Sequence, residues 1–218
     1  MQSYPPKNLA ELEQRCQQIA AQPIANLARK LGLNIPDNLV HAKGWVGQLL
    51  EVYLGATAGS RAQPDFPALG VELKTIPVDH TGKPLESTYV CTVQANHNEL
   101  YWRNSWVYNK LKHVLWVPIM DQTITTPFFW RMDDKAEDVL RTDWEELMEM
   151  LQLGYGKNLS AKFGTYLHIR PKAANSRVLV NYVDADGQDT KIVPKGFYLR
   201  PSFTAEILEK QKALCLSA

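Results

Sequence analysis

The chain contains few cysteines, and this shortage excludes several classes of protein. Among 218 residues only Cys16, Cys91 and Cys215 are cysteines, and they lie far apart without forming a CxxC pair. A secreted domain held together by disulfides is therefore not expected. The cysteine content instead indicates a reduced, cytoplasmic protein. The five histidines show no zinc-ligand spacing with these cysteines, so no zinc site is expected either.

Long apolar runs and an excess of one charge are also missing. No stretch approaches about 18 uninterrupted apolar residues, so no membrane span is expected. The N-terminus lacks the basic start and the apolar run of a signal peptide. Lys and Arg total 24 against 23 Asp and Glu, which excludes a histone-like polycation but leaves room for a local basic patch. The phosphate-binding motifs GxxxxGK[ST] and GxGxxG and the hydrolase motif GxSxG are absent.

Helical and strand patterns are both present. Apolar residues at helical spacing predict helices over residues 9–19, with Asn8 as N-cap, and over 24–31, 45–54, 133–149 and from Ser202 onward. Alternating or continuous apolar runs predict strands over 71–76, 87–93, 113–119, 166–169, 178–183 and 191–193. Lys110 and Lys112 are expected to lead into the strand that starts at His113, and residues 96–109 remain unassigned.

Charge is distributed unevenly along the second half of the chain. Residues 133–149 carry eight acids and two bases, a net charge of −6, and the segment is either a solvated helix face or a surface for docking another protein. Residues 157–200 carry eight bases and three acids, a net charge of +5. A basic region of this kind could hold the phosphates of a nucleic acid.

Asp65, Glu72 and Lys74 form the pattern with the clearest chemical rationale. Two carboxylates near a strand can hold Mg²⁺, which prefers oxygen ligands, and Lys74 shares a strand face with Glu72. Such a site could activate water for attack on a phosphodiester, although Glu-x-Lys also occurs on ordinary exposed strands. Glu51 on an otherwise apolar helix and Lys110 could join this site, or could be a helix-face acid and a strand-edge base.

Eight blocks of sequence, which follow one another in order and cover most of the chain, lie at residues 43–51, 54–60, 64–66, 69–79, 110–116, 143–148, 169–175 and 196–199. These blocks closely resemble the MutH family, the strand-discriminating endonucleases of methyl-directed DNA mismatch repair. Residues 94–104 and 121–135 match no block of the family, so their roles stay open.

The resemblance implies an α/β fold of the restriction-endonuclease type, with a mixed sheet flanked by helices and two lobes around a DNA-binding cleft. Residues 1–218 would form one endonuclease domain, with catalytic residues in 43–117 and a DNA-reading region at about 157–200. The implied activity is Mg²⁺-dependent nicking of the unmethylated strand at hemimethylated GATC sites, with Mn²⁺ or Ca²⁺ able to occupy the metal site. The implied partners are MutL as activator and MutS through MutL, and the expected state in solution is a monomer.

Residue roles follow from the same resemblance. Asp65 and Glu72 would be metal ligands, Lys74 the catalytic lysine, and Glu51 and Lys110 auxiliary catalytic groups. The resemblance also assigns DNA contacts, which would be made by Lys43, Arg170, Lys172 and Tyr198. Two other functions remain open: a restriction-like endonuclease with a different target, and a non-catalytic DNA-binding partner protein.

Overall fold

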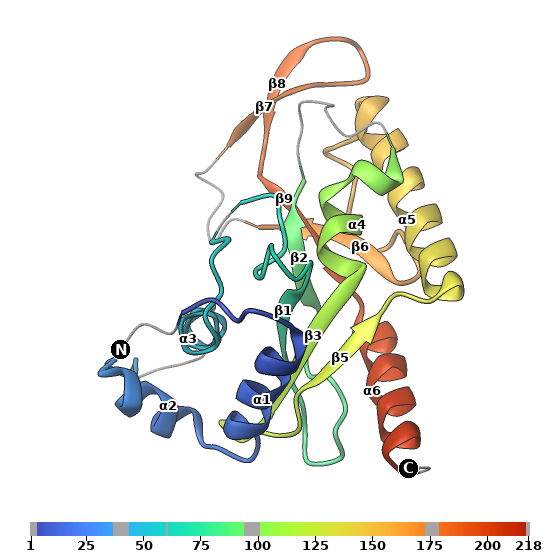
Figure 1. Ribbon diagram of the computed structural model, residues 1–218. Helices are drawn as coiled ribbons and strands as arrows, with labels where there is room; N and C mark the ends of the chain where they lie inside the picture. Colours follow the sequence, from blue (N-terminus) through green and yellow to red (C-terminus); the bar gives the residue numbers. More distant parts are fainter. Residues whose placement is uncertain (1–3, 37–43, 60, 94–100, 173–178, 217–218) are drawn as a thin grey trace. The chain divides into compact units, whose positions relative to one another are not determined.

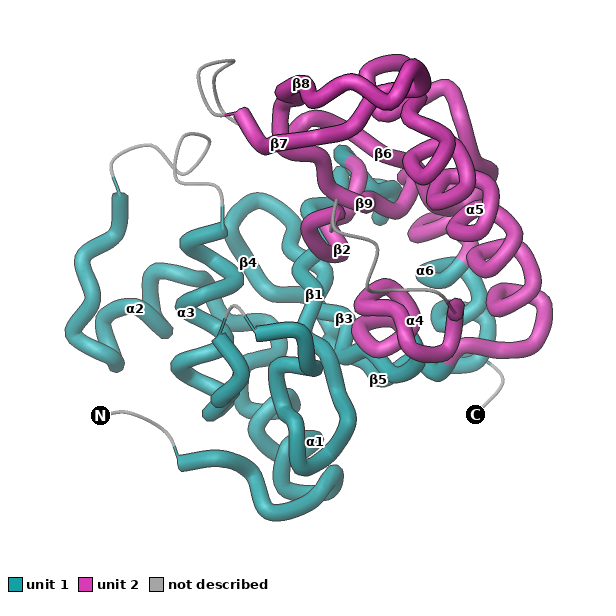
Figure 2. The backbone as a smooth tube through the Cα atoms, turned by 90° about the horizontal axis from the view of Figure 1, so that it is seen from above, with its two compact units in different colours: residues 1–86, 112–131, 207–218 teal, residues 87–111, 132–206 magenta. Residues whose placement is uncertain are grey.

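The computed structural model describes residues 4–36, 44–59, 61–93, 101–172 and 179–216 (Figure 1). Its backbone divides into two compact units, which Figure 2 colours separately. Unit 1 comprises residues 1–86, 112–131 and 207–218, and unit 2 comprises residues 87–111 and 132–206. Within the described residues, no helix combines the length and apolar character that crossing a bilayer requires.

Unit 1 is built on a mixed sheet, in agreement with the expected fold class. Its strands are β1 (Glu72–Pro77), β3 (His113–Met120), β4 (Thr123–Ile124) and β5 (Phe128–Arg131). Strand β3 pairs in parallel with β1, so that Glu72 lies opposite Val114, and pairs antiparallel with both β4 and β5. Strands β4 and β5 were not predicted, because each is too short to show a clear alternation.

Three helices lie wholly in unit 1, where apolar spacing predicted them. They are α1 (Leu9–Ile19), α2 (Ile24–Leu31) and α3 (Trp45–Leu54). The Asn8 side chain caps α1 by accepting a hydrogen bond from the Glu11 backbone N–H at 2.9 Å, as expected. The helices and the sheet share one core, to which Leu12, Leu27, Leu50 and Leu115 contribute fully buried side chains.

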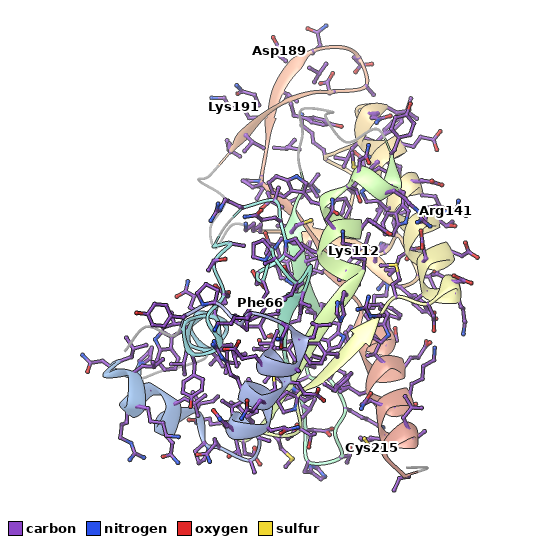
Figure 3. The ribbon with its side chains drawn as sticks, in the orientation of Figure 1. Phe66, Lys112, Arg141, Asp189, Lys191 and Cys215 are labelled. Carbon is purple, nitrogen blue, oxygen red and sulfur yellow. The ribbon has the colours of Figure 1, made fainter. Side chains whose placement is uncertain are left out.

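Unit 2 contains an antiparallel sheet in the order β2–β9–β6, made of β2 (Thr88–Thr92), β9 (Lys195–Leu199) and β6 (Leu167–Pro171). A separate hairpin joins β7 (Val180–Val183) to β8 (Asp189–Ile192), and the exposed side chains of Asp189 and Lys191 mark it in Figure 3. The remaining elements are η1 (Trp102–Asn104), α4 (Trp106–Leu111), α5 (Asp134–Gln152) and α6 (Pro201–Leu216), the last of which ends in unit 1.

One detail of unit 2 differs from the expectations. Lys110 does not lead into a strand but lies in the last turn of α4, whereas Lys112, in unit 1, directly precedes β3 as expected. A helix of six residues is too short to show helical spacing in the sequence. The 96–109 stretch is described from Tyr101 onward, where it forms η1 and the start of α4.

One acidic side chain of helix α5, that of Asp143, is buried, unlike the exposed acids of the same helix. The residue is 3% exposed, and its carboxylate accepts three backbone N–H groups, from Thr165 at 2.7 Å, Tyr166 at 2.6 Å and Leu167 at 2.8 Å. A buried carboxylate needs such donors to offset its lost hydration. Asp143 therefore anchors the segment that enters β6, while the predicted stripe of Leu140, Trp144, Leu147 and Leu151 is buried beside it.

Candidate functional site

Asp65 and Glu72 are brought together by a short reversal of the chain in unit 1. Phe66 and Val71 pair as an antiparallel bridge, and Gly70, with φ at 64°, allows the tight turn between them. Asp65 therefore lies opposite Glu72, and its backbone N–H donates to Glu72 Oε2 at 3.2 Å. In return, Asp65 Oδ2 accepts from the Leu73 backbone N–H at 2.9 Å. Both carboxylates are almost completely buried, with 5% and 1% of their residue surfaces exposed.

Lys74 completes this group from the next position on the same strand face. Its Nζ lies 2.6 Å from Glu72 Oε1, and only 11% of its side-chain surface is exposed. Strand periodicity predicted that these two side chains share a face, and the ion pair confirms it. The pair places one fixed positive charge beside two buried carboxylates, which is an arrangement suited to stabilising charge that develops on a phosphate.

Helix α3 supports Asp65 through the loop that follows it. The Glu51 carbonyl accepts the backbone N–H groups of Gly55 and Ala56, which ends the helix. The next two N–H groups, of Thr57 and Ala58, donate to the Asp65 carbonyl at 2.9 and 3.3 Å. Helix α3 also packs against β1, and its half-buried Glu51 belongs to the same unit as Asp65 and Glu72.

The donor set fits a hard divalent cation that keeps part of its water. The described residues contain no group of three or more His, Cys, Asp or Glu side chains placed to hold a metal ion. Two adjoining carboxylates are nevertheless what Mg²⁺ uses where substrate phosphate and water supply the remaining ligands. Asp65 and Glu72 would hold the ion, which would supply Lewis-acid activation of the phosphate when bound.

A second group of residues, which includes the predicted Arg170, Lys172 and Tyr198, gathers on one face of the β2–β9–β6 sheet in unit 2. His168 pairs with Tyr198 across β6 and β9, and Tyr198 pairs with Tyr89 across β9 and β2. The rings of Tyr89 and Tyr198 meet edge to face at 5.3 Å, and the Arg170 guanidinium lies 5.7 Å above the Tyr198 ring. We call this surface the aromatic–basic face; its members are Tyr89, Thr92, His168, Arg170, Lys172 and Tyr198.

The two sides of this sheet have opposite character. Phe197 and Ile169 alternate with the residues of the aromatic–basic face and are buried on the other side, at 1% and 0% exposure. Arg170 and Lys172 are exposed, and Tyr198 is half-buried rather than part of the core. A surface that combines exposed cations with tyrosine rings can hold phosphates and pack against bases.

Comparisons with known proteins identify the chain. Residues 54–143 match the family model described as MutH, DNA mismatch repair enzyme MutH. DNA mismatch repair protein MutH of Shewanella oneidensis is 47% identical over 215 residues, covering 94% of this chain and 96% of the relative. The same-named protein of Vibrio parahaemolyticus is 46% identical over 214 residues, covering 94% and 95%.

The chain belongs to the MutH family. It is therefore a mismatch-repair protein that acts on DNA, and the family's enzymatic role is that of an endonuclease. The matched residues 54–143 include Asp65, Glu72 and Lys74, so the buried carboxylates lie within the part shared with MutH.

The MutH resemblance also assigns Lys110 and Lys43. Lys110 is buried in α4 of unit 2, whereas Asp65, Glu72 and Lys74 lie in unit 1. Lys43 falls outside the described residues.

Tyr89, Thr92 and His168 join the aromatic–basic face although sequence reasoning assigned them no role. A β-bulge between Tyr89 and Cys91 brings Tyr89 and Thr92 onto the same side of β2. Simple alternation would have separated them, because residues three apart on a regular strand point to opposite faces.

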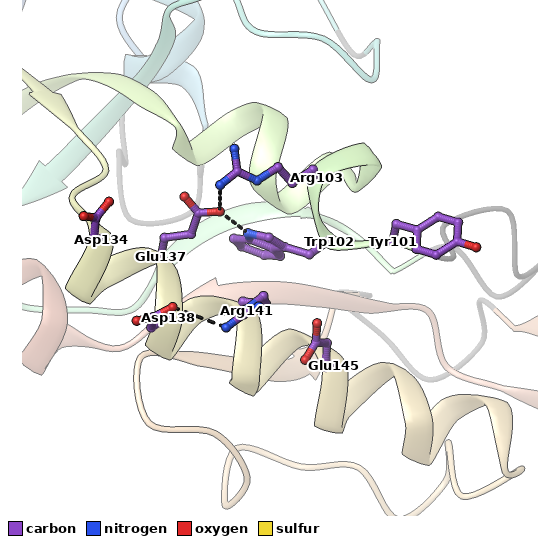
Figure 4. A pocket seen from close by; sticks show the side chains of 8 residues that line it. All are labelled: Tyr101, Trp102, Arg103, Asp134, Glu137, Asp138, Arg141 and Glu145. Carbon is purple, nitrogen blue, oxygen red and sulfur yellow. Dashed lines mark hydrogen bonds and ion pairs between the residues drawn. The ribbon is translucent and has the colours of Figure 1, made fainter.

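The acidic face of α5 lines a pocket of about 560 Å³ together with η1 (Figure 4). Arg103 from η1 forms an ion pair with Glu137 at 2.8 Å, and Trp102 Nε1 donates to the same carboxylate at 3.2 Å. Arg141 pairs with Asp138 at 3.3 Å on the exposed side of the helix. Arg141 is already counted in the net charge of −6 for residues 133–149, whereas Arg103 comes from outside that segment and offsets one further negative charge.

Proposed function

We propose that this protein nicks the unmethylated strand of hemimethylated GATC sites, on the 5′ side of the G, in a reaction that requires Mg²⁺. The observation that carries the proposal is the buried pair of Asp65 and Glu72 with Lys74 at 2.6 Å from Glu72. MutH-family membership supports a nuclease reaction on DNA, and the aromatic–basic face supplies groups that can bind phosphates and bases.

The residues of this chain would divide the work as follows. Asp65 and Glu72 would hold the divalent ion and keep it at one position, because backbone N–H groups orient both carboxylates. Lys74 would donate to the attacking water or to a phosphate oxygen, and its ion pair with Glu72 keeps the ammonium at that point. Glu51 of unit 1 and Lys110 of unit 2 would act as auxiliary catalytic groups.

Recognition would rest on residues of the aromatic–basic face. Arg170 and Lys172 would contact phosphates and base edges, and Tyr198 would pack against the position of the adenine N6 methyl group. Adenine N6 lies in the major groove, where a methyl group changes both the shape and the hydrogen-bonding edge of the base. MutL would activate the enzyme and MutS would act through MutL, with the protein itself a monomer.

The activity is tested by mapping cuts on matched duplexes. The protein is incubated with Mg²⁺ or EDTA and with duplexes that carry an unmethylated, hemimethylated, fully methylated or scrambled GATC site. We expect a nick 5′ to the G on the unmethylated strand, only with Mg²⁺ and only at GATC. Cutting at another sequence would indicate a restriction-like enzyme with a different target, and binding without cutting would indicate a non-catalytic partner protein.

A variant of Glu72 tests whether the buried carboxylates carry the chemistry. Glu72→Gln should lower nicking by about 100-fold or more while duplex binding is largely retained, because the carboxylate serves the metal rather than the phosphate contacts. Glu86→Gln removes the same charge from an exposed residue of the same unit and serves as the matched control. Nicking by Glu72→Gln at the rate of the control would contradict the assignment.

A further inference from the structure

Lys172 is held in place on the aromatic–basic face by a neutral partner. Its backbone N–H donates to the Pro194 carbonyl at 2.8 Å, which fixes the residue at the end of β6. Its Nζ donates to Thr92 Oγ1 at 2.6 Å and lies 4.8 Å from the centre of the Tyr89 ring. The side chain therefore crosses from β6 to β2, past β9, and ends between a hydroxyl group and an aromatic face.

The hydroxyl of Thr92 is linked in turn to Tyr89. The Tyr89 hydroxyl and Thr92 Oγ1 are 2.9 Å apart, and either can be the donor of that hydrogen bond. Because an ammonium group can only donate, Thr92 must accept from Lys172. In this hydrogen bond the Lys172 ammonium is therefore the donor and the Thr92 hydroxyl oxygen is the acceptor.

This contact orders the lysine without neutralising it. An ammonium group has three N–H donors, so a bond to one hydroxyl leaves two for an incoming ligand. The ring of Tyr89 attracts the cation but cancels none of its charge. The Lys74–Glu72 ion pair in unit 1 is different, because there a carboxylate balances the positive charge.

Local structure explains why Thr92 is available for this role. The bulge in β2 brings Thr92 onto the side of Tyr89, and Thr92 lies opposite Gly196 of β9. A Cβ atom on Gly196 would come within 3.0 Å of the Tyr89 ring and 3.1 Å of the Tyr198 ring. Gly196 therefore leaves space for the rings, and the lysine can pass over β9 to reach Thr92.

We propose that Thr92 is a positioning residue for DNA recognition, and that its hydroxyl presets the Lys172 ammonium for contact with the duplex. The proposal rests on the proposed function in that Lys172 is taken to touch DNA. An exposed lysine otherwise loses side-chain freedom when DNA binds, and a lysine already held loses less. Thr92 should therefore act on binding and not on the chemical step.

Four variants separate positioning from a structural role. Thr92→Val keeps the shape and the strand preference but removes the hydroxyl, and Thr92→Ser keeps the hydroxyl. Lys172→Ala removes the group that is positioned, and the double variant Thr92→Val/Lys172→Ala closes a mutant cycle. For each protein we would measure KM and kcat on a hemimethylated GATC duplex, Kd for the same duplex in EDTA, and the thermal unfolding midpoint.

Thr92→Val should raise KM and Kd by about three- to tenfold, the scale of ordering one flexible side chain, with kcat unchanged. Thr92→Ser should restore binding to within about twofold, and adding Thr92→Val to Lys172→Ala should have no further effect. An undiminished effect of Thr92→Val in the Lys172→Ala background would overturn the proposal. Failure of the wild type to nick GATC would overturn the proposed function instead, and the Kd cycle would still test the Thr92–Lys172 coupling.

Discussion

Replacing His168 by glutamine should make the folded protein less sensitive to mild acid. His168 is 4% exposed, and neither ring nitrogen has a hydrogen-bond partner among the described residues. Burial, followed by the nearby charges of Arg200 and Arg170, lowers the pKa of His168 to about 4, with a weaker opposing effect from the Ala161 backbone. The imidazole is therefore neutral in the folded protein at neutral pH, while its Tyr198 neighbour meets it edge to face at 6.2 Å.

The size and direction of the effect follow from this shift. The pKa is 6.5 in an unfolded chain and about 4 in the fold, so between these values the unfolded state binds more protons. Stability therefore rises with pH across this window and is lost as the pH falls through it. His168 should contribute a loss of about 2 kcal/mol between pH 7 and pH 5, and of about 3 kcal/mol once the pH is below 4.

Denaturant unfolding at a series of pH values measures this contribution. Glutamine is polar and does not titrate, so the free energy of unfolding of the wild type should fall by about 2 kcal/mol more than that of His168→Gln between pH 7 and pH 5. The pKa of His113 is also lowered, by burial and by Arg131, but this contribution is common to both proteins and cancels in the difference. Two parallel curves would refute the reasoning, whatever their vertical offset.

Three further outcomes are expected. The Tyr198→Ser variant should still nick unmethylated GATC but should lose about 1–3 kcal/mol of discrimination against the methylated strand. The ratio of the cleavage rates of the two strands measures this discrimination, and an unchanged ratio would indicate that Tyr198 is a packing residue. Asp143→Asn should lower the free energy of unfolding by about 3 kcal/mol, because an amide cannot accept from all three N–H groups, and an equal denaturation midpoint would argue against that anchor. Nicking at low protein concentration should rise several-fold when MutL and ATP are added, and a flat response would remove MutL activation from the proposed function.

Local sequence patterns were enough to place most helices and the central strand. Asn8 caps α1, and residues 114–117 form a strand with no exposed surface, because capping and apolar runs act over a few neighbouring residues. The same short-range logic put Glu72 and Lys74 on one face of β1, where the structure shows them 2.6 Å apart. The Asp65–Glu72 contact also arises locally, from a turn of four residues between Phe66 and Val71.

Contacts between distant segments decided the remainder. In the sequence, Asp143 is indistinguishable from the other acids of a charged helix. In the fold, residues 165–167 lie beside it and supply three backbone N–H donors to its carboxylate. Thr92 lies 80 positions before Lys172, and a bulge with no sequence signature sets which side of β2 it occupies. Periodicity reports only which neighbours share a face, whereas these partners are selected by strand pairing across the folded chain.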